Sequence, residues 1–185
     1  MAFFGLSNPY IAKLNSDGTY SDGFKCSEAV STAVTPAFNE GALYGDNKLV
    51  EYIKEFKNAA VEAGVTSLPI VAANILFGHK VTENSIIYNV DDAANYVGYG
   101  FISTELKKGK RVYGACILKK VLFAEGGDSY STKGDSITFN TPTISGTASA
   151  PDDGDYKEVK FFDKKTDAED FIKGYLNITP KCETP

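Results

Sequence analysis

The chain has 185 residues and a net charge of −5, with 43% hydrophobic and 23% charged residues. These values suit a single folded domain over residues 1–185 and exclude a disordered chain. The acidic balance argues against binding to nucleic acid through phosphate contacts, and 12 Phe, 11 Tyr and 17 Gly without Trp favour strands and turns.

Turn signals separate short apolar runs along the whole chain, which is typical of an antiparallel all-β domain. They occur at 15–18, 22–23, 45–47, 107–110, 126–128 and 152–155. The first residues lack the segments of a signal peptide, and no apolar run approaches the ~20 residues of a membrane span. We therefore expect a soluble protein made in the cytoplasm.

The first half of the chain predicts one strand, one ambiguous segment and one helix. Residues 24–34 alternate between faces and predict a half-buried strand. In 49–63, Leu49, Ile53 and Phe56 have helical spacing, so periodicity alone favours a helix over a strand. Residues 68–77, ended by Gly78 as a C-cap, predict a nearly all-apolar and therefore buried helix.

The second half predicts mostly strands. Residues 96–106 and 111–123 flank a Lys-Lys-Gly-Lys turn and predict a hairpin that is apolar on both faces, so both faces should be covered. Short strands are expected at 136–139, 143–148 and 156–162.

A second helix is predicted at 166–176. Thr166 begins it, and Glu169, three residues later, completes a capping box.

Few residues could carry catalysis. His79 is the only histidine and follows the predicted helix cap, where a surface or helix-end role is expected. Cys26 and Cys116 lie on apolar strand faces, where thiols are usually inert. The acidic pairs 91–92 and 152–153 lie in turns and predict solvated carboxylates. We expect no catalytic residue, no metal site and no cofactor.

Several stretches in order resemble the major tail proteins (tail tube proteins) of long, non-contractile-tailed phages of Gram-positive bacteria. They are residues 4–14, 29–36, 41–47, 68–73, 77–80, 96–101 and 132–139. No single motif is diagnostic, but their order and combined length make the resemblance specific. It covers nearly the whole chain up to Leu176.

The resemblance implies a β-sandwich or barrel of the tail tube type with one or two short helices. Such subunits form hexameric rings that stack into the tail tube of the virion, assembled in the host cytoplasm. The implied partners are other copies of the chain, the tape measure protein in the lumen, and the tail terminator and distal tail proteins. DNA passes in transit without specific binding, and no membrane is involved.

The resemblance also revises the ambiguous segment, because residues 49–61 correspond to a long strand in that family. The preceding loop, 35–47, becomes the candidate for contacts to the next ring. Its proposed contact residues are Phe38, Asn39, Leu43, Tyr44 and Asp46. The remaining segments are an N-terminal segment, 1–22, and a C-terminal tail, 177–185, which is either an arm onto a neighbour or an extended end.

Two other functions stay open from sequence. The many Phe and Tyr residues suit a monomeric β-sandwich module that recognises a carbohydrate. A small hydrolase using Cys116 or the paired aspartates is the third hypothesis.

Overall fold

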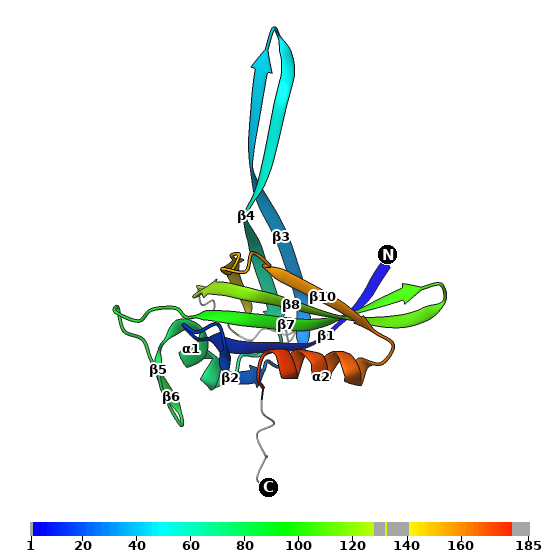
Figure 1. Ribbon diagram of the computed structural model, residues 1–185. Coiled ribbons are helices and arrows are strands. Elements are labelled where there is room, and N and C mark those ends of the chain that lie inside the picture. Colours follow the sequence, from blue (N-terminus) through cyan, green and yellow to red (C-terminus); the bar gives the residue numbers. More distant parts are fainter. Residues whose placement is uncertain (1, 128–131, 133–140, 179–185) are drawn as a thin grey trace.

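The computed structural model describes residues 2–127, 132 and 141–178 (Figure 1). Its strands are β1 (Ala2–Leu14), β2 (Tyr20–Lys25), β3 (Ala29–Gly45), β4 (Lys48–Val65), β5 (Lys80–Thr82), β6 (Ser85–Ile87), β7 (Tyr96–Lys107), β8 (Lys110–Ala124), β9 (Thr143–Ala148) and β10 (Lys157–Phe162). The helices are α1 (Ile70–Phe77) and α2 (Lys165–Tyr175). The predicted strand at 136–139 and most of the C-terminal tail lie outside the described residues.

One antiparallel sheet dominates the fold, so the predicted mainly β class is confirmed. Its strands run in the order β2-β1-β7-β8-β9-β4-β3, and β10 pairs with β8. The predicted central hairpin forms as β7 and β8, which pair from Lys107↔Lys110 to Tyr96↔Leu122. None of the helices in the described part of the chain is both long and apolar enough to cross a membrane.

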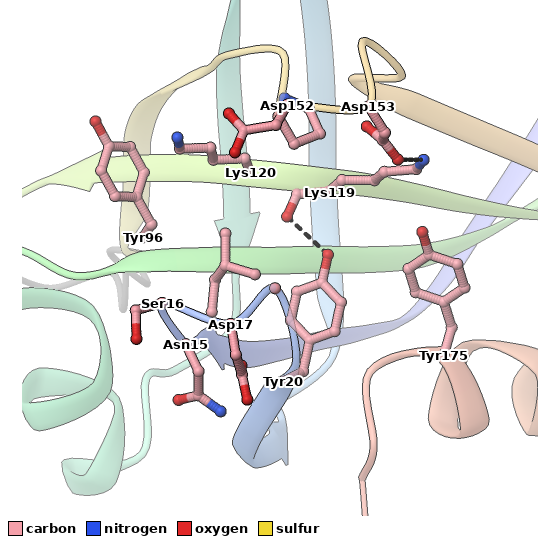
Figure 2. Close-up of a pocket in the computed structure, with 13 residues that line it drawn as sticks. Asn15, Ser16, Asp17, Tyr20, Tyr96, Lys119, Lys120, Asp152, Asp153 and Tyr175 are labelled. Carbon is pink, nitrogen blue, oxygen red and sulfur yellow. Dashed lines mark hydrogen bonds and ion pairs between the residues drawn. The ribbon is translucent and has the colours of Figure 1, made fainter.

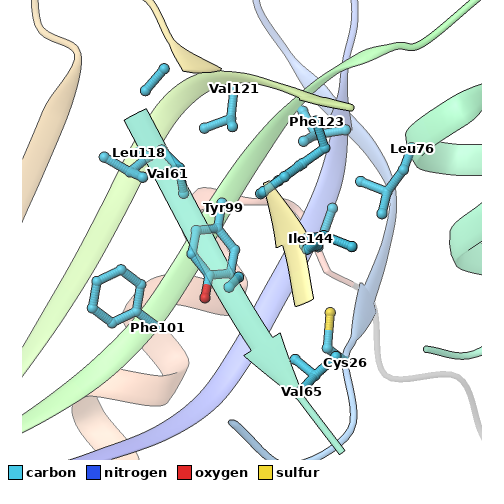
Figure 3. Packing of buried hydrophobic residues seen from close by; sticks show 14 of the residues in the cluster. Cys26, Val61, Val65, Leu76, Tyr99, Phe101, Leu118, Val121, Phe123 and Ile144 are labelled. Carbon is cyan, nitrogen blue, oxygen red and sulfur yellow. The ribbon is translucent and has the colours of Figure 1, made fainter. Parts of the chain in front are cut away.

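The larger core lies between β7–β8 and the part of the sheet formed by β4 and β9 (Figure 3). Tyr99, Leu118 and Phe123 are almost completely buried there and face Val61 of β4. Helix α1 contributes Leu76 to the same cluster. The sheet therefore bends over itself and encloses apolar side chains, which is the arrangement of a sandwich or barrel.

The opposite face of β1, β7 and β8 is covered by α2, where Ile172 and Leu176 are fully buried. The helix approaches this face closely because β7 carries glycine at two positions beneath it. A Cβ at Gly98 would lie 2.6 Å from Leu176, and one at Gly100 would lie 2.6 Å from Ile172. The prediction that both faces of the hairpin are covered is confirmed, and Gly98 and Gly100 serve helix packing in mid-strand.

The predicted capping box of α2 is wrong. The N-cap is Lys164, and no side chain caps the helix. Glu169 instead accepts hydrogen bonds from Asn8 and Tyr10 of β1 and pairs with Lys173 at 2.8 Å. Burial alone would raise the pKa of this carboxyl, but these partners hold it below its usual value. Glu169, which the sequence suggested as part of a helix cap, therefore links α2 to β1 of the sheet.

The predicted strand over 24–34 is interrupted. β2 ends at Lys25 and β3 begins at Ala29, because the chain turns here from the neighbour of β1 to the neighbour of β4. The backbone N–H of Cys26 donates to Pro9 and that of Thr66 donates to Glu28, so polar groups in the turn are satisfied.

Helix α1 begins two residues later than predicted and ends at the predicted Gly78 cap, which has a positive φ of 76°. Ala72, Ile75 and Leu76 are buried as expected, whereas Ile70 and Val71 remain exposed. The helix is therefore a half-buried one on the rim of the larger core.

Candidate assembly surface on the β3–β4 hairpin

β3 and β4 form a hairpin whose outer half projects away from the body (Figure 1). At the base, residues 59–64 of β4 also pair with β9. Beyond Asn58, β4 pairs only with β3 among the described residues. The projecting half of β3, residues 35–45, spans roughly 35 Å at the usual rise of a strand. This outer half, residues 35–58, is termed the projecting hairpin.

A tight turn closes the tip of the projecting hairpin. Gly45 pairs with Lys48, so Asp46 and Asn47 are the two central residues of the turn. Both have positive φ, 50° and 62°, which is the conformation of a type I′ turn. Asp and Asn tolerate this left-handed conformation better than other non-glycine residues, so the local sequence selects the turn.

The region predicted as the loop 35–47 is therefore mostly strand, and that part of the prediction is wrong. Residues 35–45 belong to β3, and only Asp46 and Asn47 form a turn. The expectation from the resemblance that 49–61 is a strand is confirmed, whereas its helical periodicity misled. Register shifts opposite 37–38 and 43–44 disrupt the alternation of side chains, which explains the false helical spacing.

The projecting hairpin carries large apolar side chains that nothing in the described chain covers. Seven of the 19 exposed large hydrophobic residues in the described part of the chain lie on it. They are Phe38, Leu43, Tyr44, Leu49, Val50, Tyr52 and Ile53, and each exposes between 43% and 68% of its surface. Such a concentration on one projecting element is typical of a surface that another molecule covers.

The five residues predicted for inter-ring contacts all lie on this hairpin, but not together. Residues directly paired across strands share a face, so Phe38 and Tyr44 lie with Phe56 and Leu49 on one face. Asn39 and Leu43 belong to the opposite face, and Asp46 is in the turn. Their common location was predicted, but their division between two faces was not.

Sequence reasoning missed the apolar residues of the second strand. Tyr52 pairs with Ala42 and Ile53 pairs with Gly41, so each large side chain stands opposite a small one. The signal was present in the apolar residues that occupy both alternating faces of 49–56. A strand that is apolar on both faces is usually covered on both sides, and the described body of the protein leaves these residues exposed.

An ion pair links the two strands in the middle of the hairpin. Lys54 pairs with Glu40 across the strands at 2.8 Å and lies over the Phe38 ring at 4.6 Å. The hydrogen bond from Lys54 lowers the pKa of Glu40, and the hydrogen bond to Glu40 raises the pKa of Lys54 and of Tyr52. This face therefore combines aromatic rings with a neutralised ion pair.

Besides its backbone pairing with β9, the base of the hairpin contacts the body through aromatic rings and a side-chain hydrogen bond. Phe56 stacks on Tyr156 with ring centroids 4.2 Å apart, and Phe38 meets Phe56 edge-on at 6.2 Å. The Thr32 hydroxyl lies 2.7 Å from the buried Tyr99 hydroxyl. The base of the projecting hairpin is therefore fixed to the body.

A second feature that could bind a ligand is a hollow of about 560 Å³ at the end of the sheet (Figure 2). Tyr20, Tyr96 and Tyr175 line it, as expected of a carbohydrate site. However, the Tyr20 hydroxyl donates to the Lys119 carbonyl at 2.8 Å, and Lys119 pairs with Asp153 at 2.7 Å. Several polar groups of the hollow thus satisfy one another. Asp153 keeps 56% of its side chain exposed, as predicted for a solvated carboxylate in a turn, and it also pairs with Lys119.

Among the candidate catalytic groups, the structure brings His79 and Asp92 together, whereas Cys26 and Cys116 are buried in the larger core. Burial raises the pKa of the Cys26 thiol to about 12 and that of Cys116 to about 11, which makes both poor nucleophiles at neutral pH. His79 follows the helix cap, as predicted, but it is buried and pairs with Asp92 at 2.6 Å. The predictions of a surface histidine and a solvated Asp92 are therefore wrong. Cys182 lies outside the described residues.

Comparison of the chain with models of protein families and with curated proteins finds no match.

Proposed function

We propose that this chain is a structural protein that assembles with copies of itself into stacked rings forming a phage tail tube. The observation that carries the proposal is the projecting hairpin, with apolar side chains exposed on both of its faces. The sequence resemblance to major tail proteins supports the same function. In this proposal the rings are hexameric, the tape measure protein occupies the lumen, and DNA later passes through it.

The hairpin supports assembly because it would be only marginally stable if both of its faces and edges stayed exposed to solvent. An isolated two-stranded hairpin is marginally stable, and three or more strands with a covered face are needed for independent stability. Both outer edges of the projecting hairpin lack a partner within the described residues, so their backbone N–H and C=O groups can pair with another strand. Strands from other copies satisfy both needs at once.

Closure into a ring explains how unpaired strand edges can pair with other copies without open-ended aggregation. A head-to-tail contact forms a closed ring when its rotation allows, and a sheet closed into a barrel has no free edge. A strand length of roughly 35 Å is sufficient to line a channel through a subunit of this size. The net charge of −5 offers few cations to phosphate, so DNA in the lumen slides without being held.

The proposal is tested by purifying the full chain and measuring its mass by light scattering over a range of concentrations. Negative-stain microscopy of the same samples then reveals the shape of any assembly. We expect rings and short tubes at high concentration. A protein that stays monomeric up to its solubility limit, and that is absent from tails isolated from virions, contradicts the proposal.

A monomeric carbohydrate-binding module is the second candidate, and the tyrosine-lined hollow of Figure 2 is the observation that favours it. This alternative predicts saturable glycan binding by the unassembled chain, lost when Tyr20 and Tyr175 are both truncated to Ala. It also predicts that truncation of the projecting hairpin leaves binding unchanged. Assembly without glycan binding decides for the tail tube.

A further inference from the structure

The buried His79 has an unusual environment beside a second cavity, away from the projecting hairpin. Only 4% of the residue is exposed, and its ring lies 4.5 Å from the ring of Tyr88 and 5.7 Å from that of Phe77. The cavity has a volume of about 670 Å³ and is lined by His79, Tyr88, Glu125 and residues of α1, among others. A polar ring buried here is stable only if its two nitrogens find partners.

One nitrogen has a partner and the other does not. Nδ1 lies 2.6 Å from Oδ2 of Asp92, and the same oxygen accepts the backbone N–H of Asn89 at 2.9 Å. Nε2 is buried and has no hydrogen-bond partner among the described residues. With the proton on Nδ1, donated to Asp92, Nε2 presents a lone pair.

Another carboxylate lies close to that lone pair. Oε2 of Glu125 lies 3.5 Å from Nε2, and its side chain is 52% exposed, so water reaches it. Zinc binds imidazole nitrogen and carboxylate oxygen at about 2.0–2.2 Å, so two tetrahedral ligands stand roughly 3.4 Å apart. The observed separation of 3.5 Å is close to that spacing.

The Asp92 carboxylate has the position of the hydrogen-bond acceptor that usually orients a metal-binding histidine. Metal-binding histidines almost always donate their second ring N–H to a carboxylate or carbonyl, which fixes the ring and makes the coordinating nitrogen more basic. Asp92 occupies this position on Nδ1. The three residues also come from three segments, since His79 follows α1, Asp92 precedes β7, and Glu125 follows β8.

We propose that His79 and Glu125 bind one divalent transition-metal ion of the zinc type, with Asp92 as the outer carboxylate that orients the imidazole. No third His, Cys, Asp or Glu joins the two within the described ranges, so water from the cavity fills the remaining positions. The site is therefore an exchangeable one that ties three loops together. It does not depend on the proposed tail tube function.

Isothermal titration calorimetry of zinc chloride into the 185-residue chain tests the site. We expect saturable binding of one ion per chain. Glu125→Gln, which alters a half-exposed side chain, should weaken binding at least ~10-fold while the circular dichroism spectrum stays unchanged. Asp92→Asn, which removes the carboxylate that orients the imidazole, should weaken zinc binding ~10- to 100-fold.

Two controls separate this site from others. Asp91→Asn removes the same charge one residue away and should leave affinity unchanged, as should Cys182→Ser, which removes a thiol that could bind zinc. His79→Gln should abolish binding. The proposal is overturned by the absence of saturable zinc binding, as expected if His79 is instead protonated and paired with both carboxylates. Binding that survives in both Glu125→Gln and His79→Gln overturns it equally.

Discussion

Truncation of two aromatic residues on the projecting hairpin should separate ring formation from ring stacking. In the variant Phe38→Ala/Tyr44→Ala, the substituted residues are 43% and 68% exposed in the single chain, so the cost to folding should stay within about 1 kcal/mol. If these residues seat one ring against the next, the variant should still form rings but few long tubes.

The size of the effect follows from the exposed area. A Phe or Tyr side chain offers about 200 Å², and apolar burial contributes about 25 cal/mol per Å², so covering the exposed parts contributes about 2 and about 3 kcal/mol. If ordering costs remove half of this sum, about 2.5 kcal/mol remains, which corresponds to a roughly 70-fold rise in the concentration needed for stacking.

The assay is sedimentation velocity over a concentration series, with tube lengths measured in negative stain. The matched control is Phe161→Ala/Tyr88→Ala, which truncates one Phe and one Tyr of 48% and 60% exposure away from the hairpin. Tubes of normal length from the hairpin variant at wild-type concentration would refute the reasoning and show that these rings do not seat the stack.

Three further predictions concern the body of the protein. Gly100→Ala places a Cβ 2.6 Å from an isoleucine methyl of α2 and should cost about 1–3 kcal/mol in urea unfolding, whereas Gly174→Ala, which meets no atom within 4 Å, should be neutral or slightly stabilising. Because the folded pKa of Glu169 is lowered, its contribution to stability is present above the unfolded pKa and lost as the pH falls through the folded one. Glu169→Gln should therefore flatten the acid limb of stability against pH, and an unchanged limb contradicts this. Burial raises the pKa of Cys26 and Cys116, so a thiol reagent at neutral pH, followed site by site with mass spectrometry, should modify neither in the folded chain.

The central part of the fold was predictable because local sequence and tertiary packing agree there. The β7–β8 hairpin has apolar residues on both faces and a compatible turn at Lys108 and Gly109, both of positive φ. The Gly78 cap of α1 likewise follows from glycine's freedom to adopt the left-handed conformation. In both places a short stretch of sequence determines its own structure.

The candidate assembly surface was only partly predictable, because its residues are not buried by their own chain. Periodicity identifies elements through burial against a core, and the projecting hairpin has no core beneath it. Its register shifts at Phe38 and Tyr44 disrupt the alternation further, so the helical spacing of 49–63 was accidental. The resemblance to tail proteins, not the pattern, identified β4 as a strand.

Long-range pairing explains the remaining errors. Glu169 matched a capping box in sequence, but its partner Tyr10 lies 159 positions away and no local pattern contains it. His79 was expected at the surface because it follows a helix cap, yet Asp92 and the rings around it bury the side chain. Polar residues with distant partners are the ones that sequence reading misplaces.

Hydrogen exchange of the projecting hairpin tests the central claim most directly, because the claim is that other copies of the chain cover it. Amides of residues 38–55 are measured in the dilute monomer and in the assembled state. We predict fast exchange in the monomer, where both outer edges are unpaired within the described chain, and strong protection after assembly. Equally fast exchange in both states, with protection confined to the body, would contradict the account.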